Sequence, residues 1–141
     1  MLTAQWREDT LFVPDEINIA IGIDTDAGLL AAVIRNVPAL TMAQLSTATR
    51  ALIDRARAGR LAPEDLQGGV FTVTNLGSFG IETFSPVINL PQSAILGIGA
   101  IRDERVPLSL TFDHRVIDGA PAARFLATLA QLIEDPSALL E

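Results

Sequence analysis

The sequence contains no cysteine and no lysine, and these two absences remove several kinds of chemistry. Without cysteine the chain can form no disulfide, no thiolate nucleophile and no thiolate metal site. All 10 basic residues are arginines, so neither a Schiff base nor a P-loop lysine is available. Acidic residues are in excess, with 17 Asp and Glu and a net charge of −7, which argues against a nucleic-acid partner or an anionic membrane surface.

Long hydrophobic runs are also missing, although 49% of the residues are hydrophobic. The apolar runs are too short to span a membrane, and the composition is too apolar for a disordered chain. The first ten residues show neither the basic nor the apolar region of a secretory signal, so we expect a cytoplasmic protein. The length suits one domain, and we take residues 1–141 as a single domain.

The first half of the sequence predicts an arm, a β-hairpin and a helix. Residues up to about 16, with Trp6 as the large anchor, indicate a strand fragment or arm. Residues 17–23 alternate with a period of two, residues 24–28 favour a turn and residues 29–34 are apolar, which together predict the hairpin. Thr41 and Gln44 have capping-box spacing, and the apolar stripe after them predicts a helix that ends at Gly59.

The second half predicts a short helix at residues 62–66, then three strands and a second long helix. Residues 70–74, 93–101 and 106–112 have strand composition, and Pro121 opens a helix that ends before Pro136. Gly97 and Gly99 lie on one face of the middle strand, where another element can approach closely. We therefore predict a two-layer α/β sandwich, with the helices covering one face of a mixed, largely antiparallel sheet.

The only histidine, His114, is the first candidate for proton transfer, because its unperturbed pKa lies near neutral pH. It follows the last predicted strand, lies between Asp113 and Arg115, and precedes Asp118 by four residues. A strand end that leads into a tight glycine turn can hold an imidazole rigidly. The alternative is a structural site, with His114 on the surface, Asp113 paired with Arg115, and Asp118 capping the final helix.

Other kinds of site are less favoured. One histidine and nearby carboxylates, without cysteine, are few ligands for zinc, so we expect no metal. Gly97 and Gly99 lack the third glycine, the acidic partner and the following helix of a dinucleotide-binding fingerprint. No serine lies in a G-x-S-x-G elbow. Thr74 taken alone is a strand-end hydroxyl, followed by a turn at residues 75–77.

Residues 108–120, which read LSLTFDHRVIDGA, resemble the D-H-R-x-x-D-G signature of the catalytic domain of 2-oxo acid dehydrogenase acyltransferases. Further stretches agree in the same order, namely residues 18–35, residues 61–69 with 71–77, and residues 91–99. The resemblance covers nearly the whole chain. Acetyltransferases of the chloramphenicol type and peptide-synthesis condensation domains have a related signature that begins with two histidines. Asp113 occupies the first of those positions here, which favours the lipoyl-linked family.

The resemblance implies acyl transfer between a dihydrolipoyl thiol, carried on a separate lipoyl domain, and the thiol of coenzyme A as substrate. It makes His114 the general base, Thr74 the hydrogen-bond donor to the tetrahedral oxyanion, and Asp118 an orienting or structural residue. It also implies a chloramphenicol-acetyltransferase-like fold in a homotrimer or larger shell, where His114 and Thr74 meet across a subunit interface. The implied partners are the lipoyl domain, the decarboxylase component and the dihydrolipoamide dehydrogenase component.

The sequence also departs from the family. From the resemblance we expect it to begin well inside the family's catalytic domain, without counterparts of a helix and strands that line the substrate channel. The connection at residues 102–105 is unusually short. We therefore expect residues 1–141 to form an N-terminally incomplete catalytic domain that is a poor catalyst alone. The alternative is a non-catalytic assembly module of the same fold.

Overall fold

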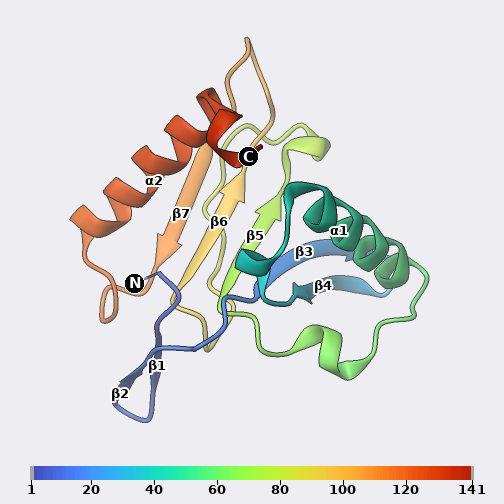
Figure 1. Cartoon of the computed structure of the whole chain (residues 1–141), viewed down its shortest axis with the longest axis horizontal. Helices are drawn as coiled ribbons and strands as arrows, with labels where there is room; N and C mark the ends of the chain where they lie inside the picture. The colour runs from blue at the N-terminus through green and yellow to red at the C-terminus, as the bar shows by residue number, and fades with distance from the viewer. Residues whose placement is uncertain (1, 141) are drawn as a thin grey trace.

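The computed structural model describes residues 2–140, which form a five-stranded sheet with two long helices on one face (Figure 1). Across the sheet, the strands are β4 (Gly28–Ile34), β3 (Ile19–Thr25), β5 (Phe71–Asn75), β6 (Ala94–Ile98) and β7 (Leu108–Phe112). Pairing is antiparallel at both edges of the sheet and parallel at β3–β5 and β5–β6. The predicted two-layer sandwich with a mixed sheet is therefore confirmed, although only two of the four strand pairs in this sheet are antiparallel.

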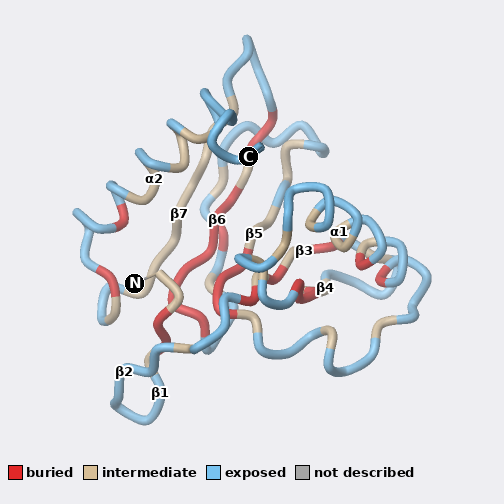
Figure 2. Tube along the Cα trace, viewed as in Figure 1, coloured by how far each residue is buried: buried red, intermediate tan, exposed pale blue. Residues whose placement is uncertain are grey.

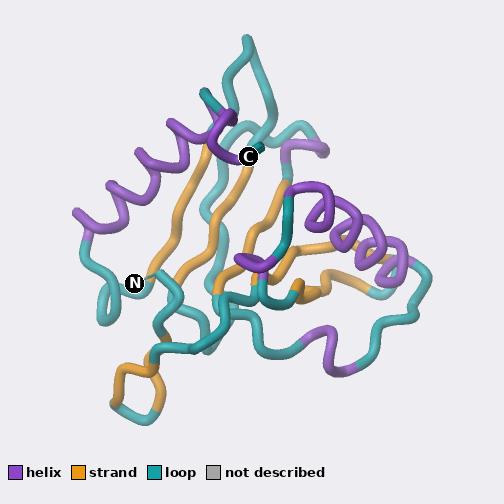
Figure 3. The backbone as a smooth tube through the Cα atoms, in the orientation of Figure 1, coloured by secondary structure: helices purple, strands orange, loops and turns teal. Residues whose placement is uncertain are grey.

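A separate small hairpin precedes the sheet. It consists of β1 (Gln5–Arg7) and β2 (Thr10–Phe12), and it extends from the lower edge of the molecule in Figure 3. Glu8 and Asp9 form its turn with positive φ angles of 45° and 58°. The predicted strand fragment or arm is thus a hairpin. Short 3₁₀ helices lie at Val37–Ala39, Pro63–Leu66, Gly77–Phe79 and Pro136–Leu139.

The two long helices begin at or near the positions that local sequence signals predict. Before α1 (Met42–Arg57), the predicted capping box is present, since Gln44 N donates to Thr41 Oγ1 at 3.2 Å and Thr41 N donates to Gln44 Oε1 at 2.9 Å. The sequence predicted that Pro121 opens the second long helix, and α2 (Gly119–Glu134) begins two residues before it. A proline is tolerated in the first turn because the first N–H groups of a helix have no intrahelical partner. No helix in residues 2–140 is long and apolar enough to cross a membrane.

The helices and the sheet bury two adjacent clusters of apolar side chains, while the outer faces of the helices stay exposed (Figure 2). Under α2 the buried residues are Val70, Phe71, Ala94, Leu96, Ile117 and Ala122, and under α1 they are Ile23, Ala32, Ile34, Leu52 and Ala56. Between the two helices an apolar groove of about 480 Å³ remains open above the centre of the sheet. Its walls include Ile21, Val73 and Leu96 from the strands and Leu45, Phe125 and Leu129 from the helices.

The opposite face of the sheet is covered by the connection between β5 and β6, which runs behind the strands in Figure 1. A Cβ atom placed on Gly97 would lie 2.8 Å from Cζ of Phe84, and one on Gly99 would overlap the backbone of Glu82. The predicted close approach to Gly97 and Gly99 is therefore confirmed. The same packing brings Gly77 against the backbone of Gly99, so this end of the sheet has no room for larger residues.

Candidate active site

His114 lies in the turn that follows β7, as the sequence predicted. Its backbone is held on both sides, because Val116 N and Ile117 N each donate to Asp113 O at 3.0 Å. The imidazole itself is 73% exposed and lies against the Phe112 ring, with 5.5 Å between ring centroids. The position of this histidine is thus set by the turn, while its ring stays accessible to another molecule.

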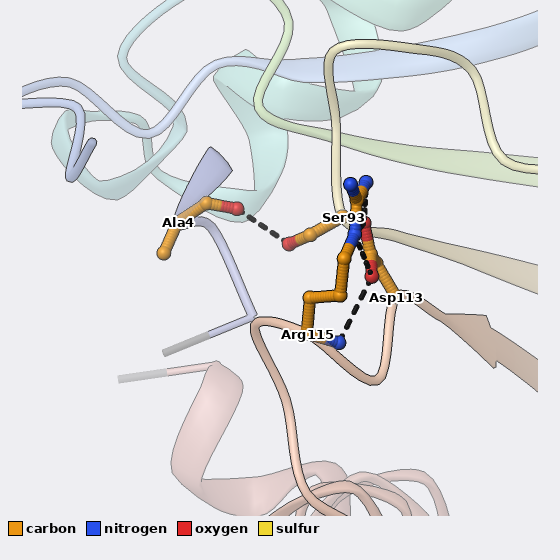
Figure 4. A network of polar contacts seen from close by, with 4 residues as sticks. All are labelled: Ala4, Ser93, Asp113 and Arg115. Atoms are coloured by element: carbon orange, nitrogen blue, oxygen red, sulfur yellow. Dashed lines mark hydrogen bonds and ion pairs between the residues drawn. The ribbon is translucent and has the colours of Figure 1, made fainter. Parts of the chain in front are cut away.

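Asp113 and Arg115 form a close ion pair on the two sides of His114 (Figure 4). The Arg115 guanidinium donates to Asp113 through Nη2 at 2.7 Å and through Nε at 3.0 Å, and Arg115 N donates to Oδ1 at 3.0 Å. The hydrogen bonds from the Arg115 side chain are the main reason that the pKa of Asp113 lies below its usual value. The expected ion pair is confirmed, and it leaves Asp113 a poor candidate for a base near neutral pH.

Asp118 occupies the N-cap position of α2, but its carboxylate makes no cap hydrogen bond, so the cap prediction is wrong for the side chain. Instead Oδ1 lies 3.8 Å from Nδ1 of His114, and both side chains are largely exposed. At 3.8 Å the contact is longer than a hydrogen bond, so it places the carboxylate beside the ring without fixing which ring nitrogen carries the proton. The structure therefore brings His114 and Asp118 together.

Thr74 lies near the end of β5, on the face of the sheet opposite the helices, and is half-buried. A Cβ atom on Gly22 of β3 would lie 3.0 Å from Thr74 Oγ1, so the hydroxyl occupies space that this glycine leaves open. Thr74 lines a hollow of about 550 Å³, whose rim includes the exposed side chains of Leu29 and Val87. The hollow is mainly apolar, and a hydroxyl in such a setting can donate a strong hydrogen bond to a developing oxyanion.

The strand register places His114 and Thr74 toward opposite ends of the sheet. Thr74 is paired with Gly97, whereas Phe112, the last residue of β7, is paired with Ala94. The two candidates are therefore separated by about 10 Å or more along the strands and by about 10 Å across them. A catalytic group must lie within about 3 Å of the atom it acts on, so two groups this far apart in one chain do not act together on one reacting centre.

Ser93, which was not among the predicted site residues, lies immediately before β6 and is 1% exposed. Its hydroxyl donates to Ala4 O (Figure 4), and its carbonyl accepts from Asp113 N at 2.7 Å. The only signal in the sequence was a polar residue at the start of an otherwise apolar strand. Within the described residues, no cluster of three His, Asp or Glu side chains could hold a metal ion.

Comparisons with known proteins agree with this fold. Residues 1–141 match the family of the 2-oxoacid dehydrogenases acyltransferase (catalytic domain). The dihydrolipoyllysine-residue acetyltransferase component of the acetoin cleaving system of Bacillus subtilis is 37% identical over 152 residues, covering 99% of this chain and 38% of that protein. A dihydrolipoamide acetyltransferase of Azotobacter vinelandii superposes with a TM-score of 0.91 at 34% identity, covering 99% of this chain and 63% of that one.

A second solved structure, the cubic core of a pyruvate dehydrogenase multienzyme complex, has a TM-score of 0.90 at 35% identity and is covered to 63%. The chain thus spans less than two thirds of these solved chains and little over a third of the Bacillus relative. In the Azotobacter enzyme, the catalytic mechanism was investigated at a serine, a histidine and an asparagine four residues after that histidine. Since the match spans the whole sequence and the fold agrees, the chain belongs to the catalytic-domain family of the 2-oxo acid dehydrogenase acyltransferases.

Proposed function

We propose that this chain is the core of a coenzyme A-dependent dihydrolipoamide acyltransferase of a 2-oxo acid dehydrogenase complex. The observation that carries the proposal is the pairing of His114 with Asp118 on a fixed turn, four residues apart. This spacing equals that of the histidine and asparagine investigated in the Azotobacter enzyme. The hydroxyl of Thr74, within a mainly apolar hollow, corresponds in chemistry to that enzyme's serine.

In this proposal His114 acts as the general base. Its free ring nitrogen accepts the proton of the attacking thiol, and the thiolate forms a bond to the carbonyl carbon of the thioester. The carbonyl oxygen becomes an oxyanion, which accepts a hydrogen bond from the Thr74 hydroxyl. The intermediate then collapses, the original carbon–sulfur bond breaks, and the leaving thiolate takes the proton back from the imidazolium. The acyl group has moved between the dihydrolipoyl group and coenzyme A, with no net change in protonation.

The separation of His114 and Thr74 within one chain supports a site shared between copies. We propose a homotrimer or a larger shell in which His114 of one copy faces Thr74 of its neighbour. The exposed apolar rim of the Thr74 hollow, including Leu29 and Val87, supports an interface there, because monomers rarely expose such groups together. The relative that forms a cubic core supports assembly of the same kind.

We also propose that residues 1–141 form an N-terminally incomplete catalytic domain. The apolar groove between α1 and α2 supports this, since about 480 Å³ of space lined by aliphatic and aromatic side chains lies open to solvent. The test compares acyl transfer by this chain with transfer by a version extended upstream in the same gene. We expect the extended version to be faster, and equal rates would contradict the proposal.

The expected partners remain the lipoyl domain, the decarboxylase component and the dihydrolipoamide dehydrogenase component. A cytoplasmic location also stays a prediction, which fractionation of the source cells tests. The non-catalytic assembly module is the second candidate, and the relatives favour the acyltransferase over it, because they are named as acetyltransferase components. It predicts that the oligomer forms but stays inactive even when the upstream segment is supplied.

The decisive experiment is complementation between two inactive variants. His114→Ala and Thr74→Ala chains are prepared separately, dissociated and reassembled together, and acyl transfer from acyl-CoA to dihydrolipoamide is measured. If each site takes His114 from one copy and Thr74 from the next, random mixing restores about a quarter of the sites. Activity that stays at the level of the separate variants, while wild-type oligomers are active, would contradict the shared site.

A further inference from the structure

We propose that the segment Ala4–Trp6, here called the strap, positions His114 by holding the turn that carries it. In this proposal Trp6 and Ser93 are positioning residues that act through the backbone around His114, not groups that touch the substrate. The proposal rests on the proposed function only in taking His114 as the base. It adds residues that neither the signature around His114 nor the sequence analysis connects with the reaction.

The buried half of the connection passes through Ser93. Ser93 and Ala4 are 1% and 0% exposed, and the Ser93 hydroxyl donates to Ala4 O (Figure 4). The carbonyl of Ser93 accepts from Asp113 N at 2.7 Å. One residue therefore ties the strap to the amide that immediately precedes His114. Buried hydrogen bonds of this kind are costly to leave unmade, so the folded chain is expected to keep this connection.

The exposed half of the connection passes through Trp6. The Arg115 Cζ atom lies 5.7 Å from the centroid of the Trp6 ring, within the range of a cation–π contact. The same guanidinium binds Asp113. Arg115 is thus held by the strap on one side and by Asp113 on the other. Because Asp113 and Arg115 are the direct neighbours of His114, the strap restrains the backbone on both sides of the histidine.

The strap is itself fixed to the sheet. Gln5 is 2% exposed and forms an antiparallel bridge with Gln92, the residue before Ser93. The Gln92 side chain in turn accepts a hydrogen bond from the hydroxyl of Thr72 on β5. The strap, the start of β6 and the histidine turn therefore meet at one corner of the sheet, although they come from distant parts of the sequence.

Rigid support matters here because the imidazole has little support of its own. It is 73% exposed, with a tilted contact to Phe112 and a 3.8 Å approach to Asp118. A general base must stay within a fraction of an ångström of its working position, and a displacement of about 1 Å can lower a rate by roughly 100-fold. A loosened strap is therefore expected to lower kcat while leaving the binding of both thiol substrates nearly unchanged.

The test uses the fact that the chain contains a single histidine, so its imidazole gives one unambiguous NMR signal. The full chain is labelled with ¹³C-histidine, and the mobility of the ring is measured together with kcat and KM. The variants are Ser93→Ala, which removes the hydroxyl, and Trp6→Leu, which keeps an apolar side chain but removes the aromatic face. Trp6→Phe keeps an aromatic face, and Ser46→Ala changes an exposed serine on α1.

We expect Ser93→Ala and Trp6→Leu to increase the mobility of the His114 ring and to lower kcat by about tenfold or more, with KM values within about twofold. Trp6→Phe and Ser46→Ala are expected to match the wild type. If Ser93→Ala does not fold, Trp6→Leu, at a half-buried position, carries the test alone. An unchanged His114 signal in a folded Trp6→Leu chain would overturn the proposal.

The same measurements separate this proposal from the proposed function. If the ring becomes mobile in the strap variants but every form, including the extended wild type, is inactive, the strap is supported and the acyltransferase function is not. If acyl transfer is present but the His114 signal is insensitive to Trp6 and Ser93, the function is supported and the strap is refuted.

Discussion

The two ends of the sheet hold their candidate catalytic residues by different means. At the His114 end, the backbone is fixed by hydrogen bonds and an ion pair, and the reactive side chain is exposed. At the Thr74 end, the hydroxyl is half-buried in a hollow bordered by glycines and aromatic or aliphatic side chains. Polar contacts therefore hold the His114 end in place, whereas the Thr74 end depends on how closely the residues around the hydroxyl pack.

This difference has a chemical reason. A base that exchanges protons with a bulky thiol must be reachable, so its ring is presented to solvent while its backbone is held. An oxyanion donor works best where water is excluded, because a hydrogen bond is stronger in an apolar setting. Each end satisfies one of these demands, and the register keeps them apart within a chain. Assembly is the step that would combine them.

Replacing the base should have the largest effect. In an oligomer that shows acyl transfer, we expect His114→Ala to lower turnover by about 10²- to 10⁴-fold, because loss of a general base has effects of this size. We expect the stability of the fold to be unaffected, since the His114 side chain is 73% exposed. Turnover and the melting temperature of the same samples test both statements. Near-normal turnover would remove His114 from the mechanism.

Replacing the oxyanion donor should have a somewhat smaller effect on turnover. Thr74→Val keeps the shape of the side chain and removes the hydroxyl, and we expect a loss of about 10²-fold in kcat with little change in KM. Thr74→Ser restores the donor and should recover most of the rate. An equal loss in both variants would show that the methyl group of Thr74, and not its hydroxyl, is what matters.

The packing at the Thr74 end should be sensitive to volume. A Cβ atom on Gly99 would overlap the backbone of Glu82, so we expect Gly99→Ala to destabilise the fold by roughly 1–3 kcal/mol, as overpacking does. Gly119→Ala is the matched control, because a Cβ atom there meets nothing within 4 Å. Denaturant unfolding of both variants measures the difference. Equal stability would mean that the connection at residues 81–84 yields easily.

The parts of this structure that the sequence predicted are the ones set by local signals. The capping box at Thr41 needs only residues three apart, and the strand that ends before His114 is visible from its composition and its turn. The hydrogen bond between Ser93 and Ala4 joins residues 89 positions apart, and no local pattern encodes it. For Asp118 the local pattern left two predictions open, a helix cap and an orienting residue, and only the structure shows a side chain that makes no cap hydrogen bond and lies 3.8 Å from the imidazole.

The smallest expected effect concerns the ion pair at the His114 end of the sheet, and it depends on pH. Arg115→Gln removes the guanidinium that lowers the pKa of Asp113 in the folded state. A carboxylate with a lowered pKa stabilises the fold above its unfolded-state pKa of about 3.9, and this stabilisation is lost as pH falls through the lower folded-state value. Because the pair lies at the surface, we expect Arg115→Gln to lower the Tm by only about 4 °C or less at pH 7.

The difference in Tm between wild type and Arg115→Gln should therefore be greatest near neutral pH and should shrink below about pH 4. Added salt should reduce it as well, since exposed charges are screened. Arg124→Gln, which replaces an exposed arginine on α2, serves as the control for the loss of one positive charge. A difference in Tm that stays constant from pH 7 to pH 3 would contradict this prediction. It would show that Arg115 supports the turn through its contact with Trp6 and not through Asp113. The strap, and not the ion pair, would then be the main restraint on His114.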